Sequence, residues 1–248
     1  MKKLSFLLAV AVLLTLSACS SKNKGDSAVQ YGSMSADWPS WDSTQSLIES
    51  EDADQVLIGK ITGISFQITD KRTGHPPAEG ALEKYAEEFG SNVEPGRVFE
   101  LITIYDVHVL TTYKGEAADS TRIRMMGGRK DFREEEQWAM IQEYGMEFIP
   151  VYAENPPELE IDETYLFVLT QIEDCLPTPL NLHQSIYNLH NPFEKSDRPT
   201  APDITAQKII SLFGQEKWDT FWTQWKAENP SWQTWIDTKT VEEALAKS

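Results

Sequence analysis

Apolar and polar positions alternate along much of the middle of the chain, which is the pattern of β-strands. Residues 55–69 are rich in β-branched side chains, and between Ile64 and Ile68 apolar residues alternate with polar ones, as in a half-buried strand. Gly59 and Gly63 interrupt this segment, and glycines inside a strand pattern predict a bulge or a tight bend.

Residues 98–113 form the longest β segment, and both of its faces are largely apolar. That pattern favours a strand that is buried on both sides or coiled around a barrel. Three shorter strands are predicted at residues 120–126, 164–172 and 184–189. With strands first, helices later and hairpin-length spacing, the order of elements favours an α+β fold built on a small antiparallel barrel or sandwich.

Helical periodicity occurs between the strands and after them. Short helices are predicted at residues 43–50, 81–89 and 132–144, the second of them inside a long insertion, and a further helix ends at Gly214. A helix follows whose aromatic residues share one face at positions i, i+3, i+4 and i+7: Trp218, Phe221, Trp222 and Trp225. Asn229-Pro230 ends this helix, and residues 241–247 fit a last short one.

Composition excludes several classes of protein. The 248 residues include 39 acidic and 22 basic side chains, which give a net charge of −17 and an isoelectric point near 4.6. So acidic a chain is unsuited to nucleic acid as a main partner, because backbone phosphates need clustered Lys and Arg. Only two cysteines are present, which excludes a disulfide-rich scaffold and a multi-cysteine zinc module.

The first residues have the parts of a secretory signal peptide. Lys2 and Lys3 precede 13 mostly apolar residues, 4–16, which are too few for a membrane-spanning helix of ~20. Leu16-Ser17-Ala18-Cys19 resembles the lipobox of bacterial lipoproteins. This resemblance implies that the Cys19 sulfur carries a diacylglycerol and that the protein is lipid-anchored to the bacterial cell membrane, outside the cytoplasm. Two or more acyl chains, such as palmitate, are enough for stable anchoring.

The central segment resembles a widespread β-barrel module of secreted and lipid-anchored bacterial proteins. The matching motifs are Ile58-Gly59-Lys60-Ile61, Tyr113-Lys114-Gly115, Gly127-Gly128 and Tyr165-Leu166-Phe167-Val168-Leu169. Asp162 replaces the glycine that the family usually has before its last strand, so the turn there can differ. The resemblance implies a closed OB-like barrel and supplies no catalytic residues.

Together these patterns predict four parts of the chain. The fold class is α+β, a small antiparallel OB-like β-barrel with helical insertions and a Trp-rich C-terminal helical segment. The predicted parts are a signal peptide at 1–18, a flexible tether at 19–42, the β-barrel domain at 43–200, and a helical segment packed on the barrel at 201–248.

Searches for catalytic, cofactor and metal motifs give no site. The only Ser-x-x-Lys lies in the predicted tether, and Gly-x-Ser-x-Gly and glycine-rich phosphate loops are absent. The four histidines, His75, His108, His183 and His190, have no established ligand spacing. Cys175 is expected to be buried and inert, because its acidic neighbours disfavour a thiolate. The expectation is therefore no catalytic residue, no cofactor and no metal.

The tryptophan-rich segment has three interpretations. Its candidate aromatic patch is Trp218, Trp222, Trp225, Trp232 and Trp235. Packing against the barrel is favoured, ahead of a platform for a glycan or an envelope protein and ahead of contact with a membrane interface. The function expected is a non-enzymatic binding or structural module of the cell envelope, held to the membrane by its lipid. The alternative is an envelope hydrolase, or an inhibitor of one, with an unrecognised site.

Overall fold

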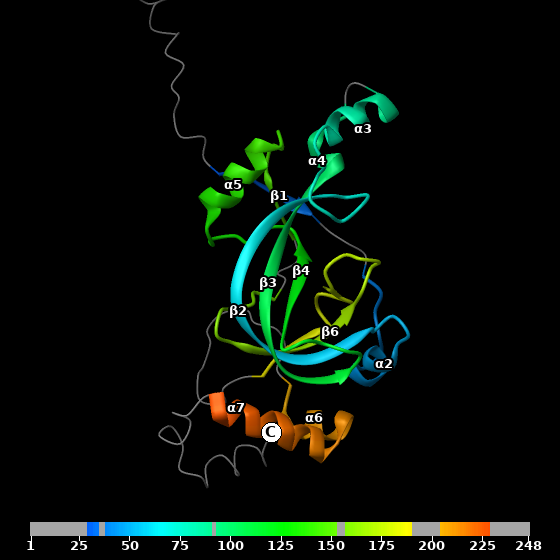
Figure 1. Ribbon diagram of the computed structural model, residues 1–248, viewed down its shortest axis with the longest axis vertical. Helices are drawn as coiled ribbons and strands as arrows, with labels where there is room; N and C mark the ends of the chain where they lie inside the picture. Colours follow the sequence, from blue (N-terminus) through cyan, green and yellow to red (C-terminus); the bar gives the residue numbers. More distant parts are fainter. Residues whose placement is uncertain (1–28, 35–37, 91–92, 153–156, 190–203, 229–248) are drawn as a thin grey trace, which may run out of the picture.

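The computed structural model describes residues 29–34, 38–90, 93–152, 157–189 and 204–228 (Figure 1). This part of the chain has an α+β fold. Its strands are β1 (Tyr31–Met34), β2 (Gln55–Asp70), β3 (Phe99–Lys114), β4 (Ser120–Met126), β5 (Ile149–Tyr152), β6 (Thr164–Thr170), β7 (Thr178–Pro179) and β8 (Ile186–Asn188). Its helices are α2 (Thr44–Glu49), α3 (Ala81–Phe89), α4 (Pro95–Val98), α5 (Glu134–Glu143), α6 (Ala206–Phe213) and α7 (Gln215–Glu228). Among the described residues, no helix has the length and apolar character needed to span a membrane.

One antiparallel sheet of six strands forms the centre of the molecule. Its order is β4-β3-β2-β6-β7, and β8 pairs with β6. The long strands β2 and β3 pair over most of their length and curve strongly (Figure 1). The β2–β3 register shifts between Ile58 and Gly59 and again between Ile61 and Gly63, which confirms the bulge predicted at these glycines. A Cβ at Gly59 would lie 2.3 Å from the Val107 side chain, so the close approach of β2 to β3 at this position needs glycine.

The two ends of the sheet approach one another without forming a continuous ladder. The Arg124 amide of β4 donates a hydrogen bond of 2.9 Å to the Pro177 carbonyl, next to β7. The strand pairings nevertheless run from β4 to β7 and leave the sheet open. The structure therefore confirms the α+β class and the antiparallel sheet, but a closed barrel is not shown.

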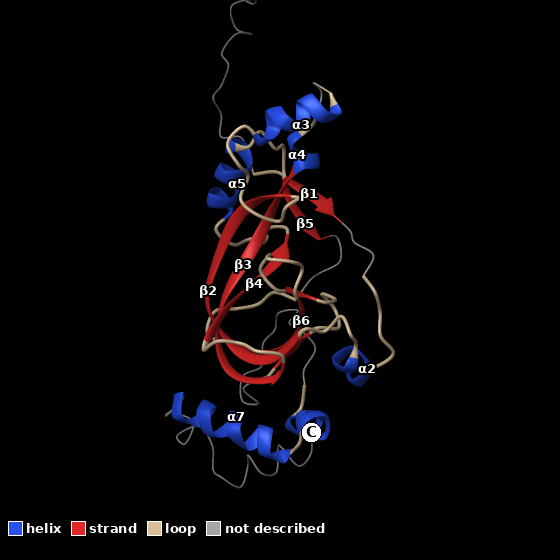
Figure 2. Cartoon of the chain, turned by 45° about the vertical axis from the view of Figure 1, so that its right-hand side comes forward, coloured by secondary structure: helices blue, strands red, loops and turns tan. Residues whose placement is uncertain are grey.

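Both faces of the sheet are buried, as the apolar faces of the long β segment predict. On one face, Leu57, Tyr105 and Phe167 belong to a core cluster inside the curve of the sheet. On the other face, Ile58 and Leu166 pack with α2, α6 and α7. Alternate side chains of a strand point to opposite faces, so neighbouring residues of β2 serve different clusters. Helices α6 and α7 lie at one end of the sheet, and α3, α4 and α5 lie at the other (Figure 2).

One boundary drawn from the sequence is wrong. The predicted tether 19–42 contains β1, which pairs in parallel with β5. Neither four-residue strand has a recognisable pattern of its own, because its position depends on pairing with a segment more than 100 residues away. Tyr31, at the start of β1, also donates its hydroxyl to Glu134 of α5. Residues 19–28 lie outside the described residues.

The turn before β6 keeps a glycine-like conformation without glycine. Asp162 has a φ of 72°, in the left-handed region that glycine favours and that Asp tolerates better than most residues. Its amide donates to the Ile61 carbonyl at 2.9 Å, and its carboxylate lies 3.0 Å from the Lys60 ammonium. These contacts hold the turn against β2, where the sequence left its form open.

Candidate functional site

One cavity lies at one end of the sheet, beside α4 and the loop that follows α5. It has a volume of about 370 Å³. The residues that line it come from β1, the turn after β2, the segment that contains α4 and the start of β3, the turn after β4, and the segment that joins α5 to β5. Its apolar walls are formed by Pro95, Phe99, Leu101, Met146, Phe148 and Pro150. Pockets of 300–1,000 Å³ with mainly apolar walls and a few polar groups are typical of small-molecule sites.

The charged groups that line this cavity differ in how they are held. The Lys71 ammonium donates to the Gly96 carbonyl at 2.7 Å, and Arg97 pairs with Glu94 at 3.4 Å. Both cations therefore already have partners within the protein. Burial raises the pKa of the Glu100 carboxyl, although Lys71, Arg124 and a hydrogen bond of 3.4 Å from the Thr69 hydroxyl lower it in part. A desolvated carboxyl of this kind gains from a further hydrogen-bond donor.

A smaller cavity of about 140 Å³ lies beside β3, β4 and β5. Arg129 lines it, and this buried guanidinium donates to the Leu159 carbonyl at 2.8 Å and to Glu160 at 3.2 Å. It also lies 4.6 Å from the centre of the Phe132 ring. Tyr105 shares the cavity wall, and burial raises its pKa to about 12. Through these contacts, Arg129 holds the loop around residue 160 against the sheet.

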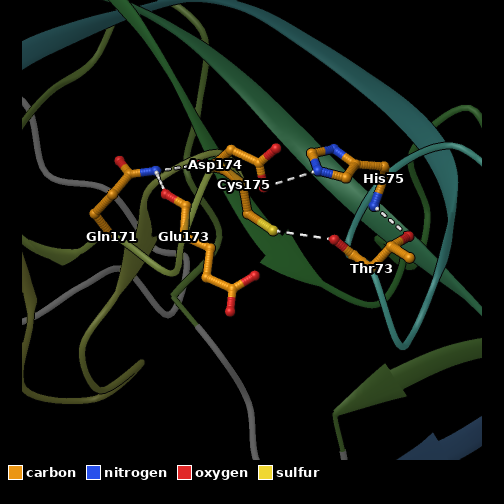
Figure 3. Close-up of polar contacts among 6 residues, drawn as sticks. All are labelled: Thr73, His75, Gln171, Glu173, Asp174 and Cys175. Atoms are coloured by element: carbon orange, nitrogen blue, oxygen red, sulfur yellow. Dashed lines mark hydrogen bonds and ion pairs between the residues drawn. The ribbon is translucent and has the colours of Figure 1, made fainter.

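A second cluster of chemically capable side chains lies where two loops meet. His75 is in the loop that follows β2, and Asp174 and Cys175 are in the loop that follows β6 (Figure 3). The first loop is closed by backbone hydrogen bonds from Gly74 to Asp70 at 2.7 Å and from Asp70 to His75 at 2.8 Å. The second is closed by a bond from the Cys175 amide to the Ile172 carbonyl at 3.0 Å.

The three side chains converge on one point. His75 Nε2 lies 3.0 Å from Asp174 Oδ1, and this hydrogen bond lowers the pKa of the Asp174 carboxyl. The Cys175 thiol donates to the Thr73 carbonyl at 3.4 Å (Figure 3). The imidazole nitrogen, a carboxylate oxygen and the sulfur all lie within 4.8 Å of one another. Among the described residues, this is the one group of three such side chains close enough to hold a metal ion.

Glycine at position 74 makes this approach of the two loops possible. Its φ is +69°, and a Cβ built on it would lie 2.4 Å from the Cys175 sulfur. No side chain fits at that distance, so the backbone of one loop rests directly against the thiol of the other. The expectation that Cys175 is buried is correct, since it is 7% exposed.

The sequence-predicted tryptophans lie mostly in packing positions. Trp218 of α7 is buried with Phe221 in the cluster that covers the outer face of the sheet. Trp222 and Trp225 are partly buried against the same cluster, and their rings stack at 5.1 Å. This placement agrees with the packing interpretation. The other two members of the predicted patch, Trp232 and Trp235, and the predicted lipid-attachment residue Cys19 lie outside the described residues.

The histidines are dispersed in the fold. His108 of β3 lies 3.0 Å from Glu228 at the end of α7, and His183 donates its amide to Asn181. His190 lies outside the described residues. Among the described histidines, His75 alone belongs to a group of three possible metal ligands, and its partners are about 100 positions later in the chain. No local spacing signals such a cluster, so a metal site could not be predicted from the sequence.

The cavity could not be predicted from the sequence either, because the residues that line it come from five separate segments of the chain. Comparison of the chain with protein-family models, with curated proteins and with solved structures found no match in any of the three.

Proposed function

We propose that this chain is a lipid-anchored protein of the bacterial cell envelope that binds a small, largely apolar molecule in the 370 Å³ cavity without transforming it. The cavity is the observation that carries the proposal, since its volume and apolar walls match those of ligand sites. The lipobox-like Leu16-Ser17-Ala18-Cys19 supports the anchor. The ligand would then be met at the outer side of the membrane that holds the lipid.

The cavity walls narrow the chemistry of the ligand. Phe99, Leu101 and Met146 favour an apolar body, because burying it removes apolar surface from water. Glu100 favours one N–H or O–H donor on that body, since its carboxyl is desolvated and its pKa is raised. We therefore expect an aromatic or aliphatic molecule with a single donor group.

The contacts that the positively charged side chains make within the protein favour binding without reaction over hydrolysis. The Lys71 ammonium donates to the Gly96 carbonyl and Arg97 pairs with Glu94, so neither cation is positioned to stabilise the negative charge that develops on a substrate during hydrolysis.

We also propose that the sheet is an OB-like barrel. The hydrogen bond from Arg124 to Pro177 supports this finer assignment, because it joins the two ends of the sheet.

The test is a titration with 1-N-phenylnaphthylamine, an apolar fluorophore with one N–H donor. The protein used is the soluble form, residues 20–248, in buffer without detergent. Met146→Trp places a larger side chain in the cavity wall, and Ile161→Trp adds the same side chain at a position 46% exposed and outside the cavity.

We expect saturable binding of about one probe per chain and a loss of affinity of about tenfold or more in Met146→Trp, while Ile161→Trp binds as the wild type does. Glu100→Gln should weaken binding less, because it removes charge and keeps a hydrogen-bond acceptor. Equal affinities in Met146→Trp and the wild type would contradict the proposal, as would the absence of saturation.

A further inference from the structure

We infer that His75, Asp174 and Cys175 form a binding site for a divalent transition-metal ion of the zinc type, separate from the cavity. They offer the three kinds of ligand atom that zinc takes in proteins: imidazole nitrogen, carboxylate oxygen and thiolate sulfur. The inference does not rest on the proposed ligand-binding function, because the cluster and the cavity wall have no residue in common.

The distances suit a single ion after a small adjustment. Bonds of about 2.0–2.3 Å at tetrahedral angles place the ligand atoms of zinc roughly 3.3–3.7 Å apart. Here His75 Nε2 and Asp174 Oδ1 are 3.0 Å apart, and all three ligand atoms lie within 4.8 Å of one another. The side chains of His75 and Asp174 are 43% and 80% exposed, so both can rotate toward the spacing that an ion needs.

The thiol is held in place before an ion arrives. Cys175 is buried, its sulfur is fixed by the hydrogen bond to the Thr73 carbonyl, and Gly74 lies directly against it. The His75 side chain is 43% exposed, so the cluster has a closed side at the sulfur and an open side at the imidazole and the carboxylate. Three protein ligands with an open side leave a fourth position for water or another ligand.

Charge and proton balance are consistent with a divalent ion. On binding, the Cys175 thiol gives its proton to solvent and the thiolate becomes a ligand, while His75 keeps one proton on Nδ1 and binds through Nε2. The thiolate and the Asp174 carboxylate then supply two negative charges to the ion. Arg124 contributes one nearby positive charge, since its Nη1 lies 2.9 Å from the position that a Cβ at Gly74 would occupy. Sulfur and imidazole together favour zinc and cobalt over magnesium or calcium.

The test is a titration of the full chain, purified in detergent micelles with a non-thiol reductant, first with Co²⁺ and then with Zn²⁺. A thiolate bound to Co²⁺ gives a charge-transfer absorption in the near ultraviolet, and a tetrahedral site gives strong visible bands. The variants are Cys175→Ser, His75→Ala and Asp174→Asn. The control is Glu173→Gln, which changes the acid next to the cluster that is not part of the ligand group.

We expect one Co²⁺ per chain with a thiolate band, displacement by Zn²⁺, and an unchanged result in Glu173→Gln. Cys175→Ser should abolish the band, and His75→Ala and Asp174→Asn should each weaken binding more than about tenfold, the loss that even outer-shell changes can cause. The absence of a thiolate band in the wild type would overturn the inference, and so would a band that persists in Cys175→Ser. If Cys175→Ser does not fold, the two exposed variants decide, because unchanged affinity in both contradicts the site.

Discussion

The packing of α7 on the sheet can be tested at Phe221. This side chain is 2% exposed and belongs to the cluster that contains Leu110 and Leu166 of the central sheet. Its ring centre lies 5.2 Å from that of Trp218. Phe221→Ala removes the ring and leaves a cavity between the helix and the sheet.

The expected cost follows from the burial of the ring. An aromatic side chain buries about 150–250 Å², which corresponds to an upper bound of about 4–6 kcal/mol at ~25 cal/mol per Å². Measured Phe→Ala substitutions in cores cost about 3–5 kcal/mol. Among the described residues, α7 is covered by the sheet and α6 and its polar face is exposed, so its neighbours can partly close the gap, and we expect a loss of about 3 kcal/mol in the free energy of unfolding.

The measurement is urea unfolding of the soluble form, followed by tryptophan fluorescence and circular dichroism. Phe89→Ala is the matched control, because Phe89 of α3 is 63% exposed and its removal should cost less than about 0.5 kcal/mol. If Phe221→Ala loses no more stability than Phe89→Ala, α7 is not packed on the sheet as described. A transition in which α7 alone is lost, seen as a lower m-value, would also refute the estimate.

Three further predictions each concern the substitution of a single residue. Gly74→Ala should lower the stability by about 1–3 kcal/mol in calorimetry, because the residue has a positive φ and its new Cβ would meet the Cys175 sulfur; an unchanged melting temperature would contradict this. Glu228 accepts a hydrogen bond from His108 and raises the pKa of that imidazole. The stability that this pair contributes is therefore complete below the ordinary histidine pKa of about 6.5 and is lost as the pH rises through the raised pKa. The stability difference between wild type and Glu228→Gln, less than about 1 kcal/mol for so exposed a pair, should therefore be larger near about pH 6 than near about pH 8, and a constant difference would be inconsistent with the pair. Cys19→Ala should release the protein from the membrane fraction, and a variant that stays there argues against the lipid anchor.

The fold was predictable where a residue pattern is local. The long strands β2 and β3 follow alternating and β-branched residues, and Gly59 and Gly63 marked the bulged part of β2. Helix α6 ends at Phe213, directly before Gly214, the residue that predicted its end. By contrast, β1 and β5 have four residues each and depend on one another, so no local pattern identifies them.

The candidate sites were not predictable, because each is made by contacts between distant segments. The cavity needs α4, β5 and the loop after α5 to meet at one end of β3. The cluster of His75, Asp174 and Cys175 joins the loop after β2 to the loop after β6, and the nearest hint in the sequence is Gly74, whose need for a positive φ is invisible before the fold is known. Sequence reasoning about Cys175 alone correctly placed it in the interior and missed its neighbours.

A crystal structure of the soluble form soaked with 1-N-phenylnaphthylamine would show directly whether the cavity is a ligand site. We expect electron density for one probe between Leu101, Met146 and Phe148, with its N–H directed at the Glu100 carboxyl. Density for the probe only elsewhere on the molecule, with this cavity left to water, would contradict it.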